Sequence, residues 1–319
     1  MALTTAMALP AAAQRTQPSD TTPEPVVTGL AGPLHISFGS TGRLYIADAF
    51  AGEILQADLR RASKHVVVSG LGFAPGVDVQ GSKVYFIASQ EPAGPNDQGS
   101  AELRLAQRGH VTRVADLLAF EVANNPDQQP QVPGDALSNP YDVLVLPNRR
   151  VLVADAGAND IIEVSRDGVV KTLTPLPVIR EGECATETNN GVPNGGCDPV
   201  PTAMAWGPDG YLYASGLGGE KAGRIWKIDV DTGEIVHTYT GLPPLTGVEV
   251  DRAGNVYASS LFAGKIFRIT PSGEQTAATV PGPTGLALHR GRLYAGSVST
   301  DENAPPAGQV FRVPLGAFK

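Results

Sequence analysis

The sequence has little charge and no cluster of basic residues. Charged residues make up 18% of the 319 residues, where ~25% is usual for a globular chain. The balance is acidic, with a net charge of −8, and no run of Lys and Arg interrupts it. We therefore expect no nucleic acid and no anionic membrane surface as a partner, and a small cation is the better electrostatic match. No segment approaches the ~18 apolar residues of a membrane span.

The compact motifs of several enzyme classes are also missing. The chain contains no G-x-S-x-G, no H-E-x-x-H and no C-x-x-C, so the common hydrolase, zinc protease and dithiol signatures are excluded. Two glycine-rich stretches, GLGFAPG and GLGGEKAG, have the wrong spacing for a dinucleotide-binding loop and lack its β-α-β context. We interpret both stretches as turns.

Cysteine is scarce. The only two, Cys184 and Cys197, lie 13 residues apart in a segment rich in Gly and Asn that has neither helical nor strand periodicity. A metal site would need a second cysteine pair or a nearby histidine, and neither is present. In an exported protein the pair predicts a disulfide that closes a loop.

Residues 1–23 resemble a secretory leader that lacks its basic start. A weakly apolar stretch is followed by Ala11-Ala12-Ala13, in the small-residue pattern of a cleavage site, and then by a spacer rich in Pro and Thr. No Lys or Arg precedes the apolar part, so a flexible leader without export function is the alternative. We expect export, to the periplasm or the medium, and a single domain over residues 24–319.

Glycine and proline are abundant, and they recur in a pattern. The 37 Gly and 27 Pro indicate a turn-rich β protein, and the 42% hydrophobic content is enough for a large core. A tight turn followed by a short apolar run is repeated along the chain, as in GPDGYLYASG, STGRLYIADA, RAGNVYASSL and HRGRLYAGSV. Such repetition is typical of an array of identical supersecondary units.

The repeat defines six units in one register. The origins are Pro33, Ala74, Pro140, Pro201, Leu245 and Pro283, and apolar residues follow each origin at the third and fifth positions. This period of two predicts a half-buried strand, after which three more strand-like runs follow. The sixth unit lacks its fourth strand, and EPVVTGL near the N-terminus has the matching pattern. The sequence therefore predicts an all-β, six-bladed β-propeller with four strands per blade, closed by the N-terminal strand in the last blade.

Several segments resemble known propeller families. VADAGANDIIEVSRDG, from Val153, is similar to an NHL-type repeat, and GPDGYLYASGLGGEKAGRIWKID is similar to blades of the SMP-30/lactonase and virginiamycin B lyase groups. VADLLAFEVANNPD, SNPYDVLVLPNRRVLVADAGANDIIEV and VPTAMAWGPDGYLYASGL, in this order, resemble the ScyD/ScyE-type family of secreted bacterial propellers. This resemblance covers most of the chain from about Val26. It implies an exported six-bladed propeller and carries no catalytic residues over to this chain.

The long insertions all fall on one predicted face of the ring. They are residues 89–100, 116–139, 174–199 and 297–308, in the loops that join strands 2 to 3 and 4 to 1, whereas the other loops are minimal. Because long loops on a rigid scaffold commonly carry function, we expect binding on this face. Asp116 is expected to cap a short helix through Asn124 that forms a lid over the axis.

Two other sets of residues are expected to be structural. Asp48 and Asp155 end second strands, and we interpret them as carboxylates that fix turns through backbone N–H groups. Tyrosines in a shared register are expected to pack between blades; they are Tyr45, Tyr85, Tyr213, Tyr257 and Tyr294.

The inner strands place acidic residues near the axis. The second and fourth positions after each origin include His35, Asp78, Asp142 and Glu249 and contain no Lys or Arg. Asp78 and Glu249 belong to opposite blades, so we expect them to face each other across the channel. Buried like charges must be protonated, hydrated or bridged by a cation. Asp78, Glu249 and Asp142 are the candidate metal ligands, for Ca²⁺ first and Mg²⁺ or Zn²⁺ as alternatives, and a water-filled channel without metal is the competing interpretation.

Two functions are compatible with these features. The first is a monomeric binding or scaffold module that captures a small molecule, glycan or protein on the insertion-bearing face. The second is a lactonase or lyase dependent on a divalent cation, with Asp142 as the candidate base and His35 as the group that orients the substrate. The missing motifs favour the binding module, and a propeller fold is compatible with both.

Overall fold

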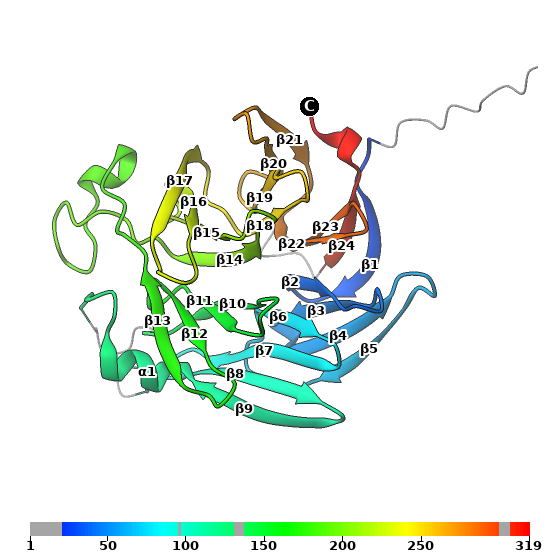
Figure 1. The fold of residues 1–319 in the computed structure, drawn as a ribbon, viewed down its shortest axis with the longest axis horizontal. Coiled ribbons are helices and arrows are strands. Elements are labelled where there is room, and N and C mark those ends of the chain that lie inside the picture. The colour runs from blue at the N-terminus through cyan, green and yellow to red at the C-terminus, as the bar shows by residue number, and fades with distance from the viewer. Residues whose placement is uncertain (1–20, 95–96, 131–136, 300–306) are drawn as a thin grey trace, which may run out of the picture.

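The computed structural model describes residues 21–94, 97–130, 137–299 and 307–319. Within them, strands β1 to β24 form six four-stranded antiparallel sheets arranged as blades around a central axis (Figure 1). Neighbouring inner strands contact one another around this axis. The predicted six-bladed propeller is confirmed. The leader predicted at residues 1–23 falls almost entirely outside the described residues.

The blades are numbered along the chain, and each is given from its inner to its outer strand. Blade 1 contains β2 (Pro33–Phe38), β3 (Leu44–Asp48), β4 (Glu53–Asp58) and β5 (Ser63–Val68). Blade 2 contains β6 (Val77–Gln80), β7 (Lys83–Gln90), β8 (Ser100–Gln107) and β9 (His110–Asp116). Blade 3 contains β10 (Pro140–Val145), β11 (Val151–Asp155), β12 (Asp160–Val164) and β13 (Val170–Pro175).

Blades 4 to 6 follow the same plan. Blade 4 contains β14 (Pro201–Trp206), β15 (Leu212–Gly216), β16 (Gly223–Ile228) and β17 (Ile235–Leu242). Blade 5 contains β18 (Gly247–Val250), β19 (Val256–Ser260), β20 (Lys265–Ile269) and β21 (Gln275–Thr279). Blade 6 contains β22 (Pro283–His289), β23 (Arg292–Ser297), β24 (Gly308–Val313) and, as its outer strand, β1 (Glu24–Leu30).

The N-terminal strand closes the ring as predicted. β1 pairs antiparallel with β24, from Glu24 opposite Arg312 to Leu30 opposite Gly308. Val27 and Leu30 are buried in the core that blade 6 shares with blade 1. The two ends of the chain are therefore joined in one sheet, which covers the edge that β24 would otherwise expose.

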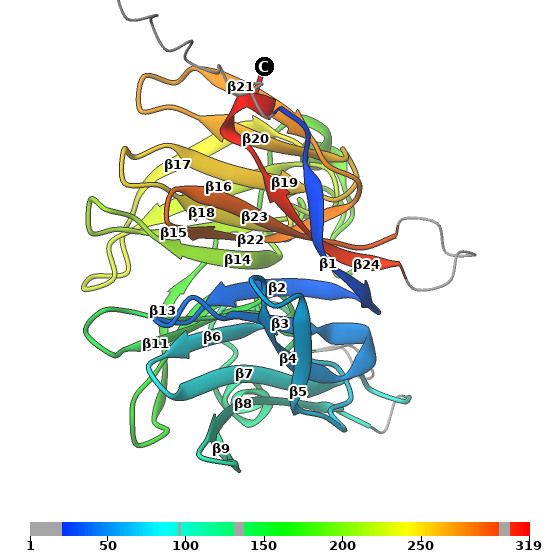
Figure 2. The same ribbon diagram turned by 90° about the vertical axis from the view of Figure 1, so that its right-hand side faces the viewer.

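The repeated turn of the sequence joins the first two strands of a blade. In blade 4 this turn ends at Gly210, whose φ of 82° is strained for a residue with a side chain. Its N–H donates to the carbonyl of Gly207. Figure 2 shows the ring from its side, with these short hairpin turns projecting to the left.

The hydrophobic core lies between adjacent blades rather than at the axis. The tyrosines of the shared register pack there as predicted: four are buried, and Tyr45 is half-buried between blades 1 and 2. Trp226 is buried in the corresponding core between blades 3 and 4. Each blade thus supplies large side chains that the neighbouring blade covers.

Asp48 and Asp155 both accept hydrogen bonds from backbone N–H groups as predicted, but only Asp155 binds its own turn. Asp48 accepts hydrogen bonds from the N–H groups of Ala31 and Gly32, at 2.9 and 2.5 Å. Asp155 accepts one from the N–H of Asn139 at 2.7 Å and two from its own turn. Both carboxylates therefore tie the entry of a blade to the end of its second strand.

The helix in the second insertion has the predicted cap but another position. α1 (Leu117–Asn124) begins after Asp116, whose carboxylate accepts a hydrogen bond from the N–H of Ala119 at 3.0 Å. Leu117 and Leu118 pack on the core between blades 2 and 3, and the helix lies beside β8 (Figure 1). The expected lid over the axis is wrong, because these apolar residues bury themselves farther out.

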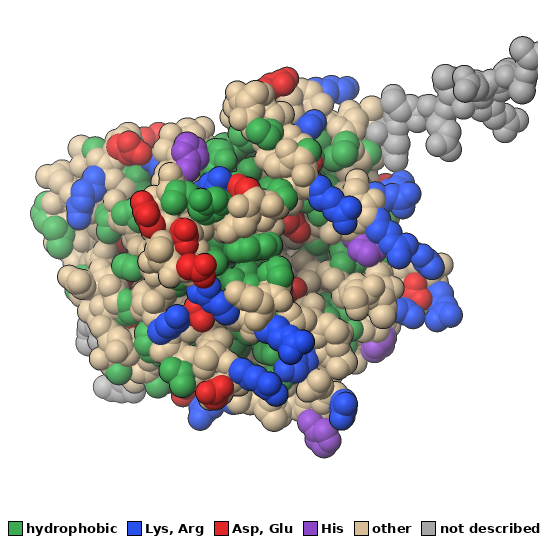
Figure 3. All heavy atoms as spheres, in the orientation of Figure 1, with side chains coloured by type: hydrophobic (Ala, Val, Ile, Leu, Met, Phe, Trp, Pro, Cys, Tyr) green, Lys and Arg blue, Asp and Glu red, His purple; other side chains and the backbone are tan. Residues whose placement is uncertain are grey.

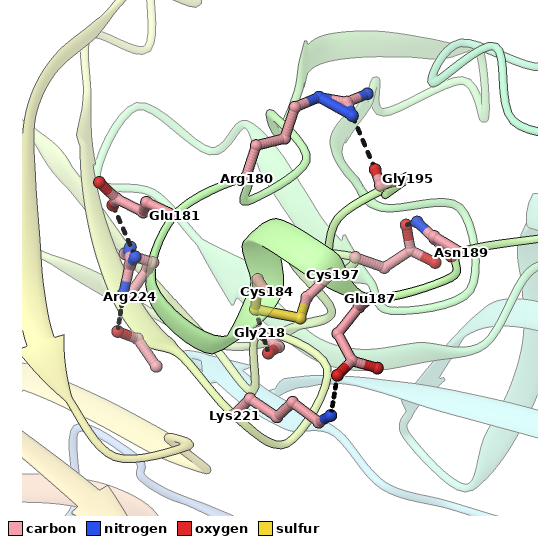
Figure 4. The surroundings of a disulfide bond; sticks show 12 residues. Arg180, Glu181, Cys184, Glu187, Asn189, Gly195, Cys197, Gly218, Lys221 and Arg224 are labelled. Carbon is pink, nitrogen blue, oxygen red and sulfur yellow. Dashed lines mark hydrogen bonds and ion pairs between the residues drawn. A yellow bond between two sulfur atoms is a disulfide. The ribbon is translucent and has the colours of Figure 1, made fainter. Parts of the chain in front are cut away.

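The predicted disulfide is present. Cys184 and Cys197 are joined, and both are buried within the loop that connects β13 with β14 (Figure 4). Ion pairs from Lys221 to Glu187 and from Arg224 to Glu181 fix the same loop to blade 4. The long third insertion is thus held at several points.

Ring closure by β1 predicts a large effect of truncation. A chain that starts at residue 31 should lose about 5 kcal/mol of unfolding free energy relative to one that starts at residue 21, because two buried aliphatic side chains and a strand pairing are removed. Denaturant titration of both truncations measures the difference. Equal midpoints would show that β1 does not hold the ring closed.

The disulfide should order the loop without being required for the fold. A Cys184→Ser, Cys197→Ser variant should lose at most about 3 kcal/mol of stability, the entropy of closing a loop of this size. Its circular dichroism spectrum should match the wild type, while proteases should cut residues 176–200 faster. Two free thiols in the unreduced wild type, or a variant that does not fold, would contradict this.

Candidate functional site

The inner strands bring the predicted axial residues to one place. His35, Asp78, Asp142 and Glu249 line a cavity of about 160 Å³ in the central channel. They come from β2, β6, β10 and β18. The described lining residues include no Lys or Arg to offset the three carboxyl groups.

His35 and Asp142 form a contact between blades 1 and 3. The Nδ1 atom of His35 lies 3.3 Å from Oδ1 of Asp142, and its Nε2 lies 2.9 Å from the carbonyl oxygen of Thr202. Because a carbonyl can only accept, Nε2 carries the proton. Burial lowers the pKa of His35 to about 4, so Nδ1 is unprotonated near neutral pH. Burial and the Asp78 carboxylate raise the pKa of Asp142 well above its usual range. Both shifts favour the uncharged forms of the two side chains.

The other two carboxyl groups turn toward the neighbouring blade. Asp78 accepts hydrogen bonds at 2.7 Å from the Ser37 hydroxyl in blade 1 and from the N–H of Val145 in blade 3. Glu249 accepts one at 3.1 Å from the N–H of Leu288 in blade 6. Each carboxyl group thus binds the inner strand of the next blade.

A row of threonines, which the sequence analysis missed, has the same role. Thr202 donates to the carbonyl of Leu245 at 3.0 Å, and Thr246 donates to that of Pro283 at 2.9 Å. Thr284 donates to the carbonyl of Pro33 at 2.6 Å. With the carboxyl groups, these hydroxyls place at least one side-chain hydrogen bond across each of the six junctions between inner strands.

The same close approach explains the small residues near the axis. A Cβ atom on Gly285 would lie 2.6 Å from the carbonyl oxygen of Leu34 in blade 1. A Cβ on Gly76 would lie 2.8 Å from the carbonyl oxygen of Tyr141 in blade 3. These glycines let the neighbouring backbones meet.

The predicted calcium ligands do not form a preorganised metal site. Among the described residues, no three His, Cys, Asp or Glu side chains are close enough to hold one ion. Asp78, Asp142 and Glu249 instead accept hydrogen bonds from backbone N–H groups. The calcium assignment and the catalytic roles of His35 and Asp142 stay predictions, and no step below depends on them.

A second site lies on the insertion-bearing face. The loop that contains α1 and the loop that contains the disulfide meet over blade 3 and enclose a pocket of about 200 Å³, which we call the insertion pocket. Its described lining consists of Glu121, Asn125, Asp127, Gln129, Pro130, Leu137, Ala156, Gly157, Asn159, Asn190 and Asp198. Side-chain oxygen atoms dominate this lining, and Lys and Arg are absent from it.

Hydrogen bonds between the two loops fix the shape of the insertion pocket. Asn159 donates to Asp127 at 3.1 Å, and Gln129 donates to Asp198 at 3.5 Å. Asn190 donates to the side-chain oxygen of Gln129 at 3.2 Å. Each of these three amide groups therefore already donates one hydrogen bond within the protein, and the carboxyl oxygens keep lone pairs for a ligand.

Acidic side chains are concentrated in and around this pocket. Asp160 is fully buried at the start of β12. Burial, together with Asp155, Glu121 and Asp127, raises the pKa of Asp160 well above its usual range. Burial and Asp127 also raise the pKa of Asp198. This concentration of carboxyl groups, with no Lys or Arg in the described lining, disfavours anions in the pocket.

Sequence reasoning identified the face but not these residues. The signal available was the density of Asn, Asp and Gln in residues 121–130 and 187–198. Their convergence depends on two loops that are far apart in the sequence. No periodic pattern in the sequence predicts that these two loops contact each other.

Comparison with known proteins supports the fold alone. No protein-family model matches the sequence, and a search of curated proteins gives no match. Among solved structures, the calcium-binding protein regucalcin from Agrobacterium tumefaciens is similar with a TM-score of 0.60 and 16% identity, covering 92% of this chain and 91% of that one. A gluconolactonase from Xanthomonas campestris has a TM-score of 0.61 and 13% identity, covering 92% and 89%. Virginiamycin B lyase from Staphylococcus aureus has a TM-score of 0.53 and 15% identity, covering 92% and 88%.

These similarities agree with the resemblance to SMP-30-like and lyase propellers at the level of architecture. They do not identify a specific family, so the ScyD/ScyE resemblance stays an expectation.

Within the described residues, no helix has the length and apolar character needed to span a membrane.

Burial of Glu249 predicts a specific pH dependence of stability. Its pKa rises from 4.5 to about 7, chiefly because of desolvation. The folded state thus holds this proton more tightly than the unfolded chain. The protonated Glu249 therefore adds its full contribution to the free energy of unfolding below pH 4.5, and this contribution is lost as the pH rises to about 7. The loss amounts to about 3 kcal/mol.

A Glu249→Gln variant should therefore show a smaller fall in stability between pH 4.5 and 8 than the wild type. Urea titrations at several pH values, with EDTA present, measure the difference between the two proteins and cancel the other titrating groups. Parallel pH profiles would contradict a raised pKa at Glu249.

Proposed function

We propose that the protein is an exported binding module that captures a ligand rich in hydrogen-bond donors, such as a sugar group of a glycan, in the insertion pocket. The observation that carries this proposal is the pocket itself. Two long insertions, one of them closed by a disulfide, converge on a set of oxygen acceptors. The disulfide also supports export, since such bonds persist in oxidising compartments.

The chemistry of the pocket selects the ligand class. Its amides of Asn159, Gln129 and Asn190 already donate to Asp127, Asp198 and Gln129, and its carboxyl groups can only accept when ionised, so a ligand gains most by donating hydrogen bonds. Sugar hydroxyls are neutral donors that do not add negative charge to the site. The volume of about 200 Å³ suits a single ring-sized group.

A second candidate function is cation-dependent lactone hydrolysis or elimination in the central channel. It is supported by the contact between His35 and Asp142, and propellers named as a gluconolactonase and a lyase share the fold. The channel groups, however, are already paired with each other or with neighbouring blades. The binding module is therefore the better supported proposal.

A glycan array followed by calorimetry on the glycans that bind tests the proposal. Asp198→Ala should weaken binding at least about tenfold, because a charged acceptor of the pocket is removed. Asp167→Ala is the matched control, since Asp167 is exposed in the turn between β12 and β13 on the opposite face. Absence of glycan binding, or equal effects of the two substitutions, would contradict the proposal. If polyamines bind and glycans do not, the donor groups of the ligand are ammonium groups and not hydroxyl groups, and the glycan proposal is wrong.

A further inference from the structure

The face opposite the insertions carries a groove lined by arginines. It has a volume of about 640 Å³ and lies where blade 6 meets blade 1. Its six arginines are Arg43, Arg60, Arg61, Arg290, Arg292 and Arg312, and its described acidic residues are Glu24 and Asp58. Figure 3 shows Lys and Arg side chains gathered along the right-hand side of this face, where Figure 1 places these two blades.

This concentration is invisible in the linear sequence. The arginines come from short turns and strand ends near both ends of the chain, and ring closure by β1 brings them together. The chain as a whole carries a net charge of −8. A groove with six arginines is therefore a local reversal of the overall charge.

Internal ion pairs use only part of this positive charge. Asp58 pairs with Arg43 and lies 3.7 Å from Arg61, and Glu24 pairs with Arg312 at 2.8 Å. For Arg60, Arg290 and Arg292, all exposed, the described residues provide no ion pair. These three guanidinium groups are available to a ligand.

The floor of the groove is aromatic. The His289 ring stacks on Phe38 with 4.4 Å between ring centroids, and Phe38 also contacts Tyr294. Burial and the nearby Arg290 and Arg60 lower the pKa of His289, so the imidazole is neutral at pH 7. The floor thus offers flat apolar surface between cationic walls.

We propose that this groove binds a small multivalent anion, one that carries two or more phosphate, sulfate or carboxylate groups. Guanidinium groups match the geometry of such oxyanions with paired N–H donors. Several separated arginines require several anionic groups on one ligand. A long polyanion would leave the groove and meet the acidic remainder of the surface, so a short ligand is favoured.

Calorimetry at constant ionic strength tests this site with three probes: tripolyphosphate, citrate and orthophosphate. We expect tripolyphosphate or citrate to bind at least about tenfold more tightly than orthophosphate, and the binding to weaken with added NaCl. The tighter of the two multivalent probes identifies phosphate or carboxylate as the preferred group. Absence of binding by both, or heparin binding without them, would overturn the proposal.

Two charge-matched variants locate the site. Arg60→Gln, Arg292→Gln should weaken binding of the tighter probe at least about tenfold. Arg166→Gln, Arg252→Gln removes the same charge from exposed turns of blades 3 and 5 on the same face, and it should bind as the wild type does. Equal weakening by both variants would show that binding depends on the overall charge of the protein and not on this groove, which would overturn the proposal. In the wild type, the ring signals of His289 should shift on binding, whereas those of His237 should not.

Discussion

The structure depends on side-chain hydrogen bonds that join the inner strands of adjacent blades around the axis. The threonines Thr202, Thr246 and Thr284 bind carbonyl groups of the next blade. Carboxyl groups bind N–H groups at other junctions, as Asp142 does with Met204 at 2.7 Å. Apolar packing between blades supplies most of the burial, but it does not fix direction, whereas these bonds do. These bonds close the ring at its centre, and the pairing of β1 with β24 in blade 6 closes it at its rim.

This constraint decides where the protein is free to bind. Polar groups in a propeller channel invite a catalytic interpretation, yet here His35, Asp78, Asp142 and Glu249 already have partners within the ring. The side chains on the two faces of the ring are not needed to join the inner strands. One has an acidic, acceptor-rich pocket between long insertions, and the other has an arginine-lined groove where the ring closes. The two proposed sites thus differ in the charge of the side chains that line them.

The fold could be predicted from the sequence because each blade repeats one pattern in a fixed register. Alternating apolar residues, the turn glycines and the shared tyrosines all report local structure, and even the missing fourth strand pointed to β1. The cap on α1 was local as well, and it was predicted correctly. The position of α1 was not, because it depends on where Leu117 and Leu118 find apolar partners.

The sites were only partly predictable, for the same reason. His35 and Asp142 were placed near the axis from their register, but their contact and the tautomer of His35 depend on burial and on the carbonyl of Thr202. A threonine follows the origin in blades 4 to 6, so that pattern was visible, although its meaning required the distance between blades. The insertion pocket and the arginine groove join segments from distant blades, which no single-chain periodicity encodes.

The interblade hydrogen bonds can be tested by the unfolding free energy of a variant with valine at all three threonine positions, Thr202, Thr246 and Thr284. Valine preserves shape and leaves three buried carbonyl groups without their hydroxyl partners. The account predicts a loss of about 3 kcal/mol or more relative to the wild type in denaturant titration, because each unpaired group costs about 1 kcal/mol or more. A variant as stable as the wild type would contradict the claim that these bonds hold the ring together.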